Sequence, residues 1–86
     1  MEDNIELIEL YYTYNKLFTE KQKKVFEMYY ISDLSLREVA LNLNISYQGV
    51  RDTINTCKKY LYDYEEKLKL KYILSEMKKR GIDLNV

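Results

Sequence analysis

The residues best suited to chemical recognition lie between positions 47 and 58 of this 86-residue chain. Gln48, Arg51 and Asn55 are spaced three and four residues apart, so a helix through them presents all three on one face. Side chains of these types can pair with the edges of nucleic-acid bases. Tyr47, directly before them, can stack on a base or cover the adjacent turn. This stretch is therefore a candidate binding face, and a solvated polar helix face is the alternative.

The charges on and around this face favour contact with protein or RNA over specific reading of DNA. Asp52 lies on the same face and repels phosphate, and Arg51 is the one cation beside it. The whole chain carries 14 basic and 14 acidic residues, so it has no net electrostatic attraction for nucleic acid. A helix from Tyr47 to about Cys57 that reads the major groove of DNA stays the alternative.

Three lysines complete the set of candidate binding residues. Lys58 follows the polar face and can neutralise a phosphate group. Lys21 and Lys24 lie where a helix is expected to begin, a position that the helix dipole makes unfavourable for cations, so phosphate contact would explain them. Solubilising lysines are the alternative for all three. The basic residues from 59 to 80 have acidic residues among them and are interpreted as a solvated helix face, with contact to RNA phosphates as the alternative.

Residue types that support catalysis or metal binding are scarce. The chain has no His, a single cysteine, Cys57, and no Gly-rich phosphate-binding loop, so we expect no enzyme activity, no metal site and no cofactor. Cys57 falls on an apolar helical seam and is interpreted as a small buried hydrophobe. The N-terminus lacks a signal-peptide pattern and no apolar run reaches bilayer-spanning length, which predicts a cytoplasmic protein without membrane insertion.

The elements that carry these residues are predicted to be helices. The chain has no Pro and only two Gly, which favours an all-α bundle of four to five helices joined by short turns. Apolar residues recur at helical spacing in the segments 4–18, 19–31, 35–44, 46–68 and 70–80. Whether the last segment continues the previous helix or folds back is left open. The expected inward residues include Leu7, Leu10, Tyr11, Tyr14, Leu17, Phe18, Val25, Phe26, Val39, Ala40, Val50, Ile54, Cys57, Leu61, Tyr64 and Leu68.

Capping residues predict where these helices begin and end. Thr19 with Gln22, and Ser35 with Glu38, match the capping box, in which the two side chains bond to each other's backbone N–H groups. Each pair therefore predicts the start of a helix. The remaining expected caps are Asn4, Ser46 and Gly81.

Residues 35–57 match the spacing of a helix-turn-helix. Asn44 tolerates the left-handed conformation that ends a helix, and Ile45 can fill the turn after it. Ala40 is small enough for the second helix to approach closely. We therefore expect residues 1–86 to form one domain, with a helix-turn-helix core at about 35–57 and a helical extension at about 58–80.

The same residues resemble two known families. The stretch from Leu17 to Ser46 is similar to sigma factor region 4, and the match to the YlxM family is closer and covers most of residues 5–72. Tyr47 departs from the Arg that the YlxM family usually has there, and Asn55 and Thr56 replace basic residues, which weakens the expectation of DNA contact. The motifs that carry the resemblance are Thr19-Glu20-Lys21-Gln22, Tyr29-Tyr30, Asp33-Leu34-Ser35-Leu36, Ile45-Ser46, Gln48-Gly49-Val50, Asp52 with Ile54, Tyr64-Glu65 and Lys67-Leu68-Lys69-Leu70.

The resemblance implies a fold like that of sigma region 4 and a regulatory or adaptor role in the signal recognition particle pathway. The implied partner is the GTPase or the RNA of that particle. The chain has ten tyrosines, six of them clustered at 11–14 and 60–64, which is more than one small core should hold, so we also expect a homodimer through the terminal helices.

Overall fold

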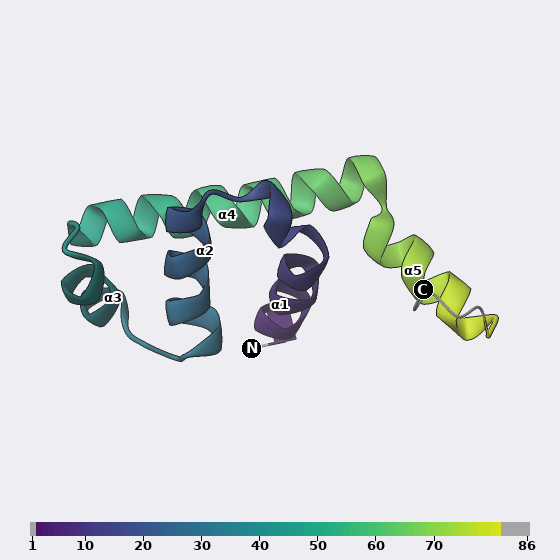
Figure 1. The fold of residues 1–86 in the computed structure, drawn as a ribbon, viewed down its shortest axis with the longest axis horizontal. Coiled ribbons are helices and arrows are strands. Elements are labelled where there is room, and N and C mark those ends of the chain that lie inside the picture. The colour runs from purple at the N-terminus through teal and green to yellow at the C-terminus, as the bar shows by residue number, and fades with distance from the viewer. Residues whose placement is uncertain (1, 82–86) are drawn as a thin grey trace.

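The computed structural model describes residues 2–81, and these fold as five α-helices without a strand (Figure 1). The all-α helix-turn-helix fold is therefore confirmed. A short 3-10 turn and a π-helical turn interrupt the order of the helices. The elements are α1 (Glu2–Tyr14), η1 (Asn15–Leu17), α2 (Glu20–Phe26), η2 (Glu27–Ile31), α3 (Leu36–Leu43), α4 (Tyr47–Leu68) and α5 (Leu70–Lys79).

Helix α4 is the longest helix in the described part of the chain, and α1, α2, α3 and α5 all contact it. It runs along the long axis in Figure 1, and α1, α2 and α3 lie beside it on one side and pack against it. Helix α5 leaves the far end of α4 and points away from α2 and α3. The first half of α4 therefore belongs to the helix-turn-helix, and its second half joins that unit to α1 and α5.

Two apolar clusters form the core along α4. Val25, on α2, packs with the helix-turn-helix residues, whereas its neighbour Phe26 packs with α1, so α2 contributes to both clusters. The partly buried Tyr30 contacts both as well. The first cluster contains Leu7, Leu10, Tyr11, Tyr14, Phe18, Phe26, Cys57 and Leu61, and the second contains Val25, Val39, Ala40, Val50 and Ile54.

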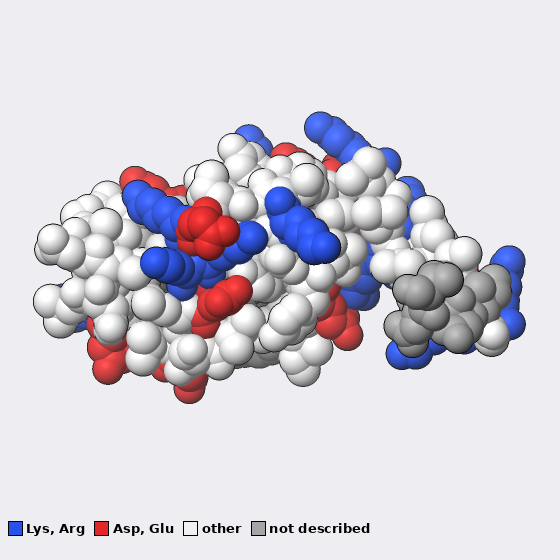
Figure 2. Space-filling view, in the orientation of Figure 1, with Lys and Arg blue, Asp and Glu red and all other residues white. Residues whose placement is uncertain are grey.

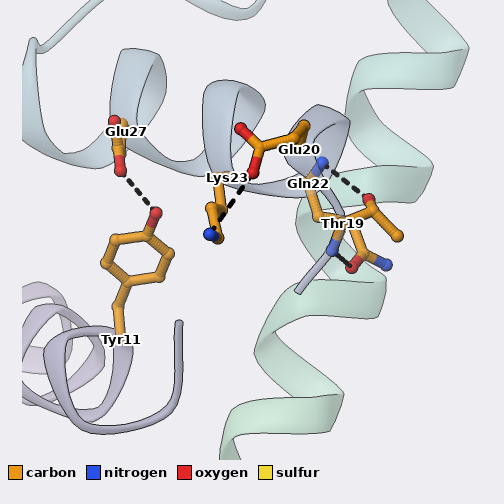
Figure 3. A network of polar contacts seen from close by, with 6 residues as sticks. All are labelled: Tyr11, Thr19, Glu20, Gln22, Lys23 and Glu27. Atoms are coloured by element: carbon orange, nitrogen blue, oxygen red, sulfur yellow. Dashed lines mark hydrogen bonds and ion pairs between the residues drawn. The ribbon is translucent and has the colours of Figure 1, made fainter. Parts of the chain in front are cut away.

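The predicted caps that open α2 and α3 are confirmed. Thr19 and Gln22 exchange bonds of 2.9 and 3.1 Å with each other's backbone N–H groups, as Figure 3 shows. Ser35 and Glu38 do the same at 2.8 and 3.1 Å. Each reciprocal pair satisfies two backbone donors that a helix start otherwise leaves open.

The turn of the helix-turn-helix is also as predicted. Asn44 has the left-handed conformation, with φ 56°, and Ile45 packs against the second cluster. The Ile45 backbone N–H donates to the Ala40 carbonyl at 3.1 Å, and Ser46 caps α4 by accepting from the Gly49 N–H at 2.9 Å. These local bonds fix the angle between α3 and α4.

The first helix differs from its prediction at both ends. Helix α1 already includes Asn4, so Asn4 is not its N-cap, and it ends at Tyr14 instead of Phe18. The 3-10 turn that follows redirects the chain so that Phe18 enters the core in an extended conformation. Leu17 therefore points outward and is 57% exposed, which makes its predicted burial wrong.

Helix α4 ends at Leu68, as its apolar pattern predicted, but Leu68 itself is not buried as expected. Lys69 takes the left-handed conformation, with φ 53°, which ends α4 and bends the chain into α5. Because the chain bends there, Leu68 is 49% exposed and not part of the core seam. Gly81, with φ 76°, follows the end of α5 as expected.

Glu65 and Tyr14 hold this bend in place. The Tyr14 hydroxyl donates to Glu65 Oε1 at 2.7 Å and accepts from the Leu70 N–H at 3.0 Å. Glu65 accepts two further bonds, from the N–H groups of Lys71 and Tyr72 at 3.1 and 3.2 Å. A carboxylate from α4 thus satisfies the free donors at the start of α5, where the helix dipole favours negative charge.

Candidate nucleic-acid and partner interface

The polar face of α4 is created by the spacing of its buried residues. Val50, Ile54 and Cys57 lie on the side of α4 that packs on the bundle. Three of the predicted binding residues, Gln48, Arg51 and Asn55, therefore lie on the exposed side. The helix-turn-helix therefore turns these three side chains toward solvent.

The residues on this face differ in whether their side chains already have polar partners within the chain. The Gln48 side chain donates to Asp52 Oδ1 at 2.8 Å, so its amide is partly occupied, while Asp52 keeps its negative charge and still repels phosphate. Arg51 is exposed and forms no ion pair with residues 4–81. Arg51 and Asn55 are thus the donors best able to contact a partner.

Tyr47 links the starts of the two helices of the motif. The Arg37 guanidinium lies over its ring, 5.7 Å from the ring centre, and the ring remains 43% exposed. A cation over an aromatic face is attracted by the ring electrons. Tyr47 therefore covers the α3–α4 junction and still offers part of its surface to a partner.

A hollow beside α4 collects several predicted residues and adds others that the sequence did not single out for binding. Arg51, Asn55 and Lys58 form its polar side. The remaining lining comes from the α2–α3 connection and from α3 and α4 themselves, namely Tyr29, Tyr30, Leu36 and Ile54. Tyr29 also lines two neighbouring hollows, one of which includes Arg37 and Tyr47.

The π-helical turn explains why Tyr29 lies here. The Ser32 N–H donates to the Glu27 carbonyl at 2.8 Å, five residues back, so the chain is wider at this turn than in an α-helix. Asp33, with φ 63°, then redirects the chain toward α3. The Tyr29-Tyr30 pair is one of the motifs that carry the family resemblance, but the sequence gives neither residue a binding role.

Lys21 and Lys24 lie apart from this hollow. Both are exposed on α2, and neither lines the hollow beside Arg51. In Figure 2, basic side chains gather over the region of α2 with acidic side chains among them. Lys23, between them in sequence, is paired with Glu20 at 3.4 Å (Figure 3). The structure thus brings together Tyr47, Arg51, Asn55 and Lys58 but leaves these two lysines on a separate surface.

Cys57 is a buried structural residue, as predicted. Its side chain is 0% exposed, and burial raises the pKa of its thiol to about 11. A thiol with such a pKa stays protonated at neutral pH and is a poor nucleophile. No helix within residues 2–81 combines the length and the apolar character needed to cross a bilayer.

Comparison with known proteins links this geometry to a family. Residues 1–82 match the model of the family UPF0122, described as "Putative helix-turn-helix protein, YlxM / p13 like". A UPF0122 protein of Clostridium novyi is 49% identical over 70 residues, which cover 81% of this chain and 61% of that protein. A UPF0122 protein of Fusobacterium nucleatum is 38% identical over 84 residues, covering 98% of this chain and 82% of that protein.

A third relative shows the same pattern of coverage. The UPF0122 protein of Mycoplasma capricolum is 46% identical over 71 residues, which cover 83% of this chain and 63% of that protein. The chain therefore spans less than two thirds of the length of the Clostridium novyi and Mycoplasma capricolum relatives that it matches.

Proposed function

This chain belongs to the UPF0122 family of YlxM/p13-like helix-turn-helix proteins, and from that premise we propose that it is a non-enzymatic adaptor or regulator of the signal recognition particle. It binds the RNA or the GTPase of that particle through the exposed face of α4. The observation that carries the proposal is the group of Arg51, Asn55 and Lys58 around one hollow at the helix-turn-helix.

The charge on this face supports an RNA or protein partner over a DNA duplex. Nonspecific binding to duplex DNA depends on several cations that neutralise phosphates. Here Arg51 is accompanied by Asp52 on the same face, and the whole chain has a formal net charge of zero. The choice of the signal recognition particle itself rests on the resemblance to YlxM proteins.

A transcriptional regulator is the second candidate function. The helix-turn-helix geometry favours it, because such a motif can insert its second helix, here α4, into the major groove. Its DNA affinity would fall steeply as salt rises. Failure to bind any member of a random duplex library at low salt would exclude it.

Replacing Arg51 with Ala should weaken binding to the signal recognition particle about tenfold to a hundredfold, because a charge-assisted hydrogen bond is lost. The measurement is titration of this protein against the purified particle, followed by separate titrations with its RNA and its GTPase. Lys67→Ala, which removes a cation from the opposite end of α4, is the matched control and should change affinity less than twofold. Unchanged affinity in Arg51→Ala, or no binding to either component, would refute the proposal.

We also propose that a second copy of the chain covers a groove between α1 and α5. Tyr12 and Leu74 contribute apolar surface to this groove and are 64% and 44% exposed. Its α1 edge carries Glu9 and its α5 edge carries Lys71 and Lys78. Glu9 is already paired with Lys71 across the groove at 3.3 Å within one copy, so the exposed apolar surface of Tyr12 and Leu74 is what a two-fold symmetric interface would bury.

Leu74→Glu should therefore convert a dimer into a monomer by placing a charge in this apolar groove. Light scattering coupled to gel filtration measures the mass directly. Leu41→Glu is the control, because Leu41 is 82% exposed on α3, and it should leave the dimer intact. A wild-type protein that stays monomeric at high concentration would rule out the interface.

A further inference from the structure

The hollow beside α4 has an aromatic side and a side of hydrogen-bond donors. Tyr29 and Tyr30 form the aromatic side, with their ring centres 4.9 Å apart and nearly perpendicular. Arg51, Asn55 and Lys58 supply the donors from three successive turns along α4. The two sides come from elements that are distant in sequence and meet only in the folded chain.

This combination is the one that proteins use for unpaired bases. A flat base gains affinity by stacking on an aromatic ring, and a neighbouring amide can pair with its polar edge. Asn55 supplies such an amide, and Arg51 and Lys58 supply cations for the adjoining phosphates. The hollow thus has groups suited to the face of a base, to its polar edge and to the adjoining phosphates.

We propose that this hollow holds one unpaired base of a single-stranded nucleic acid, stacked on Tyr29 and paired at its edge with Asn55. The inference rests on the proposed function, because it names the part of the particle that the α4 face contacts. An unpaired base of RNA and one of single-stranded DNA share this chemistry, and the 2′-hydroxyl is the group that distinguishes them.

The acidic residues nearby are consistent with this ligand. Asp33 and Glu38 line the adjoining hollow together with Lys58. Carboxylates can accept hydrogen bonds from the exocyclic amino groups of bases, although they repel phosphate. Binding at this site should therefore depend more on the base and less on the backbone charge than in a typical duplex binder.

Tyr30 anchors the aromatic side of the hollow to the core. It packs on Phe26 with ring centres 4.6 Å apart and contacts both core clusters. Tyr29 packs partly against the second cluster and lines all three hollows on this side. Tyr29 is thus the ring that a ligand can reach, and Tyr30 supports it from the core.

The test measures binding of fluorescent single-stranded RNA, single-stranded DNA of the same sequence, and the corresponding duplex, by anisotropy at low salt. We expect both single strands to bind more tightly than the duplex. Tyr29→Leu should weaken single-strand binding about tenfold to a hundredfold through loss of stacking, whereas Tyr29→Phe, which keeps the ring, should stay within about twofold of wild type. Tyr72→Leu, on α5, is the matched control and should bind like wild type.

Asn55→Ala keeps the inference testable if Tyr29→Leu destabilises the fold, because Asn55 is exposed and its loss leaves the core intact. It should weaken single-strand binding and reduce the preference among bases. Equal binding by wild type, Tyr29→Leu and Asn55→Ala would overturn the base pocket. If Arg51→Ala still weakened binding to the particle, the proposed function would survive that result. Binding to the GTPase without binding to any single strand would likewise overturn only the pocket.

Discussion

Between about pH 10 and pH 12, the free energy of unfolding should fall by about 2–3 kcal/mol for each pH unit. Tyr11 and Tyr30 cause this loss, because the folded chain raises the pKa of each phenol above its ordinary value of 10.0, and the pKa of Tyr14 is raised in the same direction. Burial raises the pKa of Tyr30 to about 12. Burial, and next a hydrogen bond to a carboxylate, raise the pKa of Tyr11 and of Tyr14, with Glu27 and Glu65 as the acceptors.

The sign follows from proton linkage. The unfolded chain releases these phenolic protons near pH 10, whereas the folded chain keeps them to higher pH. The unfolded state therefore binds fewer protons in this window, and Tyr11 and Tyr30 each remove up to about 1.4 kcal/mol of stability per pH unit. Below pH 10 their contribution is fully present. The Cys57 thiol, whose pKa is raised from 9.0 to about 11, adds a loss that begins near pH 9.

Alkaline titration followed by far-ultraviolet circular dichroism and by tyrosinate absorbance checks this prediction. Loss of helix should accompany the ionisation of the buried phenols. Tyr30→Phe should reduce the slope by about 1.4 kcal/mol per pH unit. Tyr12→Phe is the control, because the Tyr12 ring is 64% exposed, and it should leave the slope unchanged. Full ionisation of all tyrosines in a chain that keeps its helices would contradict the prediction.

The features that the sequence predicted well are those made by local hydrogen bonds. Thr19 with Gln22 and Ser35 with Glu38 form their caps within three residues, so residue type and spacing suffice to predict them. Asn44 is similar, because its left-handed conformation depends on its own side chain. The position of the helix-turn-helix and the outward face of α4 follow from these caps together with the spacing of the apolar residues.

The features that the sequence missed depend on contacts between distant residues. The bend at Lys69 is stabilised by Tyr14, which is 51 residues from Glu65 in sequence. Nothing in the sequence of residues 65–70 predicts the hydrogen bond between Tyr14 and Glu65. The π-helical turn at Glu27–Ile31 is similar, because helical spacing does not distinguish a bond to the residue four back from one to the residue five back.

The residues of the candidate site also differ in whether local sequence or distant contacts determine their positions. The α4 donors Arg51, Asn55 and Lys58 could be predicted, because one helix carries them all. Tyr29 could not be assigned to the hollow, since its place depends on the π-helical turn and on Asp33. The sequence therefore indicates the groups that we propose for phosphate and base-edge contact, but it offers Tyr47, and not Tyr29, as the ring on which a base would stack.

Phe26→Ala should lower the free energy of unfolding by about 3–5 kcal/mol, the largest single-residue effect that we expect on stability. Phe26 is 0% exposed, and its ring lies nearly parallel to that of Tyr11, with centres 4.3 Å apart. On its other side it packs on Tyr30 at 4.6 Å. Removing the ring leaves a cavity between α1 and α2 and withdraws the support of the aromatic side of the hollow.

Urea unfolding of the purified variants measures this loss, and the effect should extend to the hollow. Because Tyr30 loses its neighbour, Phe26→Ala should also weaken single-strand binding at temperatures where the chain remains folded. Tyr72→Ala is the control, because that ring is 59% exposed on α5, and surface substitutions of this kind change stability by roughly 0.5 kcal/mol or less. A loss below about 1 kcal/mol in Phe26→Ala would mean that the two clusters do not depend on this ring, since a fully buried phenylalanine ordinarily contributes several times more.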